Sequence, residues 1–292
     1  MKQLTIISGK GGTGKTTITA SLSAIADDAV IADCDVDAPD LHLILNPEVI
    51  EVEEFTGMKV AEVDKDKCIH CMECYNFCRF DAIDKDINID PIECEGCAVC
   101  EYVCKENAIK MKEKRAGFAY ISKTRFGYMA HAKLEIAEET SGKLVAVVRK
   151  NARELAERYG KKLIIIDGSP GIGCPVIAAI TGVDLVLIVT EPTVSAIGDM
   201  RRVLKVVEHF AIPAVVCINK WNLNKKNTEE IEAYCRKKGI EIIAKVPYDK
   251  TAVDSMVSGR SVIEYKPYSE ISKSISKLWD GIKEKRVWFF SG

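Results

Sequence analysis

The sequence predicts an α/β protein: a doubly wound, mostly parallel sheet with a small α+β domain inserted into it. Three observations lead to this prediction. Short apolar runs, such as 29–33, 163–167 and 184–190, alternate with segments of helical periodicity, as parallel strands joined by helices do. A glycine-rich loop separates the first strand from the first helix. Eight cysteines gather between residues 68 and 104 and mark the inserted domain.

The composition indicates a globular protein of about two domains. The chain has 292 residues, of which 47% are hydrophobic and 29% charged. A net charge of −2 lacks the basic excess of nucleic-acid-binding proteins, so we expect no nucleic-acid partner. No apolar run approaches the ~18 residues that span a membrane, and no secretory signal opens the chain. We therefore expect a cytoplasmic protein, whose 12 cysteines favour a reducing compartment.

A phosphate-binding loop follows the first strand. Residues 9–17, GKGGTGKTT, satisfy the pattern G-x₄-G-K-S/T, between a strand at 2–8 and a helix at about 15–26. Backbone N–H groups of such a loop, and the positive end of its helix, bind phosphate oxygens. We expect Lys15 to reach the β and γ phosphates and the Thr16 hydroxyl to bind Mg²⁺. The other expected nucleotide-binding residues of the loop are Gly11, Gly12, Thr13, Gly14 and Thr17.

Two buried strands end in acidic residues. The strand at 29–33 ends at Asp33, for which we expect a structural role or a position behind the Mg²⁺ ligands. The β-branched strand at 163–167 ends at Asp167, which we expect to hold Mg²⁺ through water. The glycine-rich segment 168–173 then reads as a loop that senses the γ-phosphate. Both acids fall where ligands bind in such sheets, at the carboxyl ends of strands.

Lys10 makes the resemblance to one family specific. The sequence K-G-G-x-G-K-T, with this second lysine, resembles the deviant Walker A ATPases. These include MinD and ParA proteins, Mrp-type cluster carriers, the arsenite pump ATPase and the nitrogenase iron protein. The resemblance implies a P-loop NTPase fold of SIMIBI type that hydrolyses ATP with Mg²⁺. It also implies a homodimer in which Lys10 reaches the partner's nucleotide and takes part in catalysis with Lys15.

The same resemblance assigns further residues. The family's second acid after the strand orients the attacking water and lies at the Mg²⁺ site, which maps onto Asp35; Asp37 is the alternative. In related nucleotidases an Asn at the end of a later strand reads the adenine edge, which maps onto Asn219. Pro247 occupies the place of the second base-contacting loop.

The cysteines form two runs of the spacing C-x₂-C-x₂-C-x₃-C. Thiolates are soft ligands that suit iron, and the fourth cysteine of such a run binds the neighbouring cluster. This looks like a bacterial-type ferredoxin with two 4Fe-4S clusters. Zinc or disulfides are the alternatives, although zinc sites usually use one or two C-x₂-C pairs separated by a longer spacer. Cluster I is expected on Cys68, Cys71, Cys74 and Cys104, and cluster II on Cys78, Cys94, Cys97 and Cys100. Arg79 and Lys105 replace the family's usual proline, and we hypothesise that they raise the reduction potentials.

We expect the ferredoxin-like domain at 60–115 and a discontinuous ATPase domain at 1–59 and 116–292, because the ATPase motifs resume beyond the cysteines. The cysteine pair of Mrp-type carriers is not found outside 68–104. Cys174 is expected to be a small buried residue, with a cluster-bridging role as the alternative. The polar stretch 138–143 reads as a solvated loop, or as one near the nucleotide. The remaining elements are expected as strands at 118–122, 212–219 and 240–246 and helices at 144–159, 194–209 and 268–290.

Together the motifs resemble a MinD-superfamily ATPase that contains an inserted ferredoxin domain. The resemblance implies that the nucleotide state of a homodimer controls electron transfer to a redox or metallocofactor-assembly partner. An iron–sulfur cluster carrier of Mrp type is the alternative, and a positioning ATPase of MinD or ParA type is the third. We expect the tail at 268–290 to pack on the sheet, not to bind a membrane as an amphipathic helix.

Overall fold

The computed structural model describes residues 1–135 and 141–285, which form two compact units. The first unit contains Met1–Glu53, Ala119–Lys133 and the chain from Ser141 onward. The second contains Glu54–Phe118, with Leu134 and Glu135. The expected insertion at 60–115 lies inside this second unit, which is several residues longer at the start.

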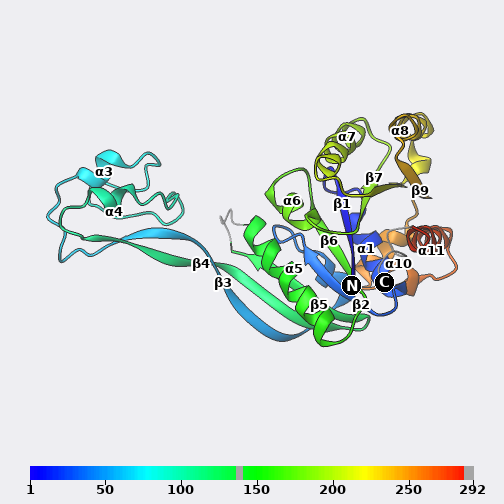
Figure 1. Ribbon diagram of the computed structural model, residues 1–292, viewed down its shortest axis with the longest axis horizontal. Coiled ribbons are helices and arrows are strands. Elements are labelled where there is room, and N and C mark those ends of the chain that lie inside the picture. The colour runs from blue at the N-terminus through cyan, green and yellow to red at the C-terminus, as the bar shows by residue number, and fades with distance from the viewer. Residues whose placement is uncertain (136–140, 286–292) are drawn as a thin grey trace. The chain divides into compact units, whose positions relative to one another are not determined.

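Within residues 1–135 and 141–285, nine strands pair in the order β3-β4-β5-β2-β6-β1-β7-β8-β9, and all but β8 are labelled in Figure 1. From β5 to β9 every neighbouring pair is parallel. The structure thus has the mostly parallel α/β sheet that the sequence predicts. The strands are β1 (Lys2–Ser8), β2 (Ala29–Cys34), β3 (Glu48–Val63), β4 (Ile109–Thr124), β5 (Gly127–Leu134), β6 (Leu163–Pro170), β7 (Leu185–Thr190), β8 (Ala214–Asn219) and β9 (Glu241–Val246).

Helices cover both faces of the sheet in the first unit. Along β1 the alternation shows this directly, because Leu4 and Ile6 pack against α1 and α11, whereas Thr5 Oγ1 donates to Ala179 O of α6 at 3.1 Å. The helices are α1 (Lys15–Ile25), α2 (Leu41–Leu45), α3 (Glu73–Phe77), α4 (Val99–Val103), α5 (Ser141–Arg158), α6 (Cys174–Ile180), α7 (Val194–His209), α8 (Lys225–Lys238), α9 (Thr251–Val257), α10 (Val262–Tyr265), α11 (Glu270–Lys283) and the 3₁₀ turn η1 (Trp221–Leu223).

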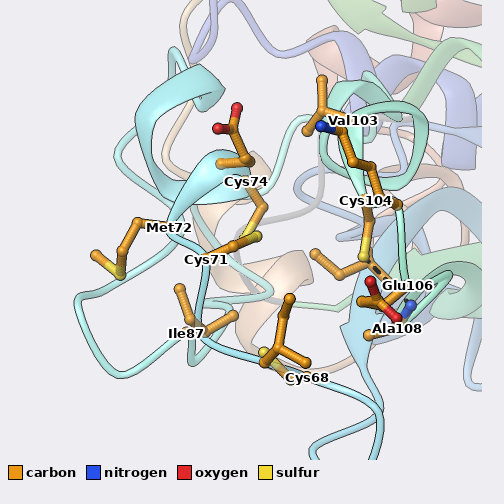
Figure 2. A pocket seen from close by; sticks show the side chains of 13 residues that line it. Cys68, Cys71, Met72, Cys74, Ile87, Val103, Cys104, Glu106 and Ala108 are labelled. Atoms are coloured by element: carbon orange, nitrogen blue, oxygen red, sulfur yellow. Dashed lines mark hydrogen bonds between the residues drawn. The ribbon is translucent and has the colours of Figure 1, made fainter.

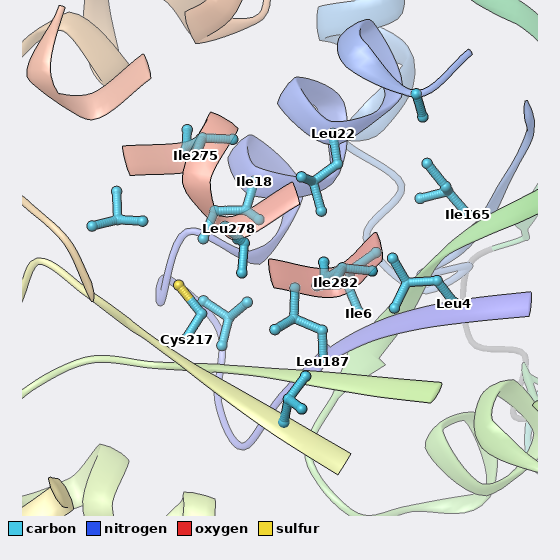
Figure 3. Packing of buried hydrophobic residues seen from close by; sticks show 14 of the residues in the cluster. Leu4, Ile6, Ile18, Leu22, Ile165, Leu187, Cys217, Ile275, Leu278 and Ile282 are labelled. Atoms are coloured by element: carbon cyan, nitrogen blue, oxygen red, sulfur yellow. The ribbon is translucent and has the colours of Figure 1, made fainter. Parts of the chain in front are cut away.

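The main core lies between the sheet and the pair α1 and α11 (Figure 3). An apolar stripe of α11 is buried in this core, with Trp279 partly buried against it, so the helix packs on the sheet, as expected for the tail. Burial of this stripe is the main source of its stability, at roughly 25 cal/mol per Å² of apolar surface. The residues of the stripe are Ile271, Ile275, Leu278 and Ile282. The predicted end of the helix, 286–290, lies outside the described residues.

Three boundaries differ from the predictions. The segment 168–170 is not a loop, because β6 continues to Pro170 alongside β1. Ser141 to Lys143 belong to α5, while 138–140 lie outside the described residues. The strands β3 and β4 are each 16 residues long, although the sequence predicts a strand only at 118–122, within β4. Most side chains of β3 are exposed, so it carries little periodic signal of burial.

The second unit has a small core. Its apolar side chains are few, and cysteines pack directly against them. The short helices α3 and α4 each begin after a residue with positive φ, Met72 at 65° and Ala98 at 61°. The two runs of cysteines thus adopt the same local conformation. The buried residues of this core are Ala61, Cys74, Ile83, Ile87 and Ile109.

Candidate functional site

The phosphate loop connects β1 to α1 and is braced from β8. Gly12 and Gly14 have φ values of 78° and 88°, which side chains disfavour. A Cβ on Gly14 would also lie 2.2 Å from Asn219 Nδ2. That amide donates to Thr13 O at 2.8 Å and so holds the loop from the carboxyl end of β8, which is separated from β1 by β7.

A cleft of about 410 Å³ opens beside this loop. Its volume falls in the range of small-molecule sites. The predicted loop residues line it, as do Asn219, Pro247 and Asp35. Asp37 is exposed and does not line it, which favours Asp35 over Asp37 as the acid that faces the nucleotide. Tyr248, Val253 and Met256 add an apolar wall.

Asp167 joins the phosphate loop to β6. Lys15 Nζ lies 2.9 Å from Asp167 Oδ2 and 3.3 Å from Asp35 Oδ2. Thr16 Oγ1 donates to Asp167 Oδ2 at 3.0 Å, and Thr19 Oγ1 donates to Asp167 Oδ1 at 2.6 Å. The structure therefore brings together the predicted lysine, the predicted hydroxyl and both predicted Mg²⁺-binding acids. Thr19 was not predicted, although its position four residues after Lys15 places it on the same helical face.

Asp33 is fully buried beside this group. Its Oδ1 accepts from the Asp35 backbone N–H at 3.1 Å, and its Oδ2 has no hydrogen-bond partner among the described residues. Burial raises the pKa of Asp33 well above its ordinary value, and Asp167 raises it further. Burial also raises the pKa of Asp35, and the nearby charge of Lys15 offsets this increase only in part. Burial opposes the charge of Lys15, but the carboxylates outweigh it and raise its pKa. Asp33 thus orients the turn that carries Asp35.

Lys10 lies outside the cleft in this structure. Its Nζ is 2.9 Å from Glu191 Oε1, directly after β7. Lys220 Nζ is 2.8 Å from the other oxygen of Glu191 and donates to Gly12 O at 2.8 Å. Sequence reasoning assigned no role to Glu191 or Lys220. Their positions at the carboxyl ends of β7 and β8 were the available signal.

Four cysteines line the first of two pockets in the second unit (Figure 2). Cys68, Cys71 and Cys74 come from the first run, and Cys104 comes from the second. The backbone N–H of Ala108 donates to Cys104 Sγ at 3.2 Å. Cys104, the fourth cysteine of the second run, thus lies in the same pocket as the first three cysteines of the first run.

The second pocket has the reciprocal arrangement. Its four thiols are Cys94, Cys97 and Cys100 of the second run and Cys78 of the first. Burial raises the pKa of Cys100 to about 11. Apolar side chains, among them Ile83, complete the wall. Within residues 1–135 and 141–285, no three His, Cys, Asp or Glu side chains are grouped as they would be on a single metal ion.

The expectation that Cys174 is buried is wrong. Its side chain is exposed, because Cys174 begins α6, whose inward positions are Val176, Ala179 and Ile180. The scattered Cys34, Cys217 and Cys235 are buried thiols.

This phosphate loop, placed between a strand and a helix at the carboxyl edge of a mostly parallel sheet, defines a P-loop nucleotide-binding protein. Residues 4–262 match the CobQ/CobB/MinD/ParA nucleotide-binding domain, and the chain belongs to that family. The chain therefore carries the nucleotide-binding domain that MinD and ParA proteins share with CobQ and CobB.

Similar proteins extend this result. The uncharacterised protein MJ0578 of Methanocaldococcus jannaschii is 33% identical over 285 residues, which cover 97% of this chain and 96% of that protein. Pyruvate synthase subunit PorD of Methanothermobacter marburgensis is 45% identical over 53 residues, 18% of this chain and 65% of PorD. The septum site-determining protein MinD of Pyrococcus horikoshii, solved with Mg-ADP, shares the fold, with a TM-score of 0.61 at 19% identity over 97% of this chain and 96% of that one. Among the described residues, no helix is long and apolar enough to cross a membrane.

Proposed function

We propose that this protein is an ATPase whose nucleotide state, in a homodimer, controls electron transfer through two 4Fe-4S clusters. The clusters would occupy the two cysteine pockets. The partner would be a protein that receives low-potential electrons or is assembled with a metallocofactor. Because thiolate ligands require reducing conditions, we infer a cytoplasmic location.

One observation carries the proposal: the eight cysteines are sorted into two pockets of four, each with three thiols from one run and one from the other. This is the pairing that two-cluster ferredoxins use. The donor set fits the group, because four thiolates and an apolar wall suit iron–sulfur clusters. The clusters would supply one-electron transfer. The likeness to PorD, a subunit of pyruvate synthase, supports a redox role.

The nucleotide site supports Mg²⁺-dependent hydrolysis. Lys15 would leave Asp167 and Asp35 and bind the β and γ phosphates. Thr16 and Asp167 would then hold Mg²⁺, with Asp35 nearby. Asp35 would accept a hydrogen bond from the attacking water and orient it. Lys10 would neutralise charge on the nucleotide of the second copy, which makes the dimer necessary for full activity.

Chain connectivity supports coupling between the two functions. The turn at Asp35 to Asp40 leads directly into α2, and α2 is followed by β3, which begins at Glu48. A change in the turn that carries Asp35 therefore acts on the segment that enters the second unit. We propose that this segment transmits the nucleotide state, by the order-or-shift mechanism common in switch loops.

Pairs of cysteine substitutions test the ligand sets. We expect the wild-type chain, purified without oxygen, to contain about eight irons. In Cys68→Ala/Cys104→Ala both changes fall in one pocket, so we expect about four irons and one EPR signal. In Cys68→Ala/Cys78→Ala the changes fall in both pockets, so we expect almost no iron.

The two double variants carry the same number of substitutions and are therefore matched controls. If each run of four held its own cluster, the iron contents would be reversed. That result, or a wild-type protein with far less iron, would contradict the proposal.

A cluster carrier is the second candidate function. It is favoured by the exposure of Cys71 and Cys97, because each pocket has one thiol that an acceptor protein can reach. Transfer of clusters to an apo-ferredoxin, followed by circular dichroism, tests this role. Transfer that Mg-ATP accelerates would favour the carrier over electron delivery.

A further inference from the structure

The ammonium group of Lys10 is fully occupied by its own chain. Its Nζ lies 2.9 Å from Glu191 Oε1, 3.2 Å from Thr193 Oγ1 and 3.1 Å from Ser195 Oγ. An ammonium group has three hydrogens to donate, and these three partners use all of them. Lys10 therefore cannot bind a phosphate without giving up at least one of these contacts.

Glu191 is the strongest of the three partners. Only 11% of its side chain is exposed, and its second oxygen accepts from Lys220 Nζ at 2.8 Å. Burial would raise the pKa of Glu191, but the hydrogen bonds from Lys220 and Lys10 outweigh it and lower the pKa. Glu191 is therefore a carboxylate at neutral pH, and charge-assisted bonds of this kind are about twice as strong as neutral ones.

The contacts also direct Lys10 away from its own nucleotide cleft. Gly11, its neighbour in the chain, lines the cleft, but Lys10 is not among the described residues that do so. Instead its side chain lies across the loop that joins β7 to α7. The lysine that the proposed dimer needs is held at the edge of the site.

We propose that Glu191, Thr193 and Ser195 form a latch that holds Lys10 on its own chain. Lys10 leaves these three residues only when it binds the triphosphate of a second copy. This inference rests on the proposed function, because it requires the dimer in which Lys10 crosses. Glu191 is then an autoinhibitory contact, and its release accompanies dimerisation. Lys220 also links the latch to the phosphate loop, because it contacts Glu191 and donates to Gly12 O.

Dimerisation can be measured where hydrolysis is blocked. Sedimentation velocity gives the dimer Kd of the Asp35→Asn protein with Mg-ATP, using protein that was purified without oxygen and carries its iron–sulfur clusters. Adding Glu191→Gln removes the charge that holds Lys10, so we expect the Kd to fall by about tenfold, because two ion pairs no longer have to be broken per dimer. Ser195→Ala removes only one neutral contact and leaves the Glu191–Lys220 pair intact, so we expect a smaller decrease in the same direction.

Glu208→Gln is the matched control, since Glu208 is an exposed acid on α7 and the charge change is the same. We expect it to leave the Kd unchanged. ADP binding, measured by calorimetry, checks that the phosphate loop stays intact in Glu191→Gln. If the loop is disturbed, the Kd of Ser195→Ala alone decides whether the latch exists.

Two failures are distinguishable. If Mg-ATP produces no dimer in the Asp35→Asn protein or in any variant made from it, the proposed dimer is wrong and the latch falls with it. If the dimer forms but the Glu191→Gln and Ser195→Ala variants have a Kd equal to or larger than that of the Asp35→Asn protein, the proposed dimer is retained and the latch is overturned.

Discussion

At the scale of single residues, the nucleotide site is a group of carboxylates that share one lysine. Lys15 contacts Asp167 and Asp35, while Asp33 is buried behind them. Unpaired buried charge is costly, so the lysine and the carboxylates neutralise one another in this structure. A phosphate could replace the carboxylates around the lysine, and a cation could replace the lysine beside the carboxylates. We propose that the site exchanges these internal ion pairs for Mg²⁺ and nucleotide.

Asp35→Asn tests which acid acts on the attacking water. We expect ATP hydrolysis, measured as phosphate release, to fall on the order of 100-fold or more, with ADP binding retained. Asp37→Asn is the matched control, because Asp37 is exposed and does not line the cleft. A large loss in Asp37→Asn with normal activity in Asp35→Asn would show that the acids have been assigned in the wrong order.

His131 on β5 makes stability depend on pH. Its Nε2 lies 2.8 Å from Ser122 Oγ, and burial, with His42 nearby, lowers its pKa from 6.5 to about 4. Below pH 6.5 the unfolded chain therefore binds a proton that the folded chain does not. The contribution of His131 is fully present above pH 6.5 and is lost as the pH falls towards 4, by roughly 3 kcal/mol at most.

The variant His131→Gln removes this titration and can keep a hydrogen bond to Ser122. Urea unfolding, followed by tryptophan fluorescence, gives stability at pH 5 and pH 7.5. We expect the variant to lose less stability than the wild type between these two values. An equal loss in both proteins would rule out His131 as the cause.

At the scale of elements, the phosphate loop is shaped as much by β8 as by its own glycines. Gly14→Ala adds a Cβ at positive φ that meets Asn219 Nδ2 at 2.2 Å. We expect ADP affinity, measured by calorimetry, to fall by about tenfold or more, because the loop must shift. Gly182→Ala is the control, since it has a φ of 72° and nothing within 4 Å. It should cost about 1 kcal/mol of stability and no affinity; equal affinities in the two variants would contradict the account.

Elements with a clear burial pattern could be predicted from the sequence. The helix at 194–209 has the predicted bounds, because apolar spacing and the cap at Thr193 agree. The carboxyl end of β6 and the length of β3 could not be predicted. Pro170 extends β6 through pairing with β1, which is a tertiary contact, and β3 is exposed along most of its length.

At the scale of the whole molecule, the sequence could predict motifs but not their partners. The phosphate loop and the cysteine runs are local, and their spacing was enough to suggest the chemistry. Lys10 and Glu191 are 181 residues apart in the chain, so only the fold reveals that they meet. Cys174 illustrates the same limit, because its exposure depends on how the first turn of α6 faces the solvent.

In the proposed function, one chain couples ATP to electron transfer. The direct test is the rate at which dithionite-reduced protein passes electrons to an oxidised ferredoxin, measured by stopped flow without nucleotide, with Mg-ADP and with Mg-ATP. We predict that Mg-ATP changes this rate, and that in Asp35→Asn the ATP-dependent rate persists because hydrolysis no longer ends it. A rate that is the same under all three conditions, in both proteins, would contradict the account.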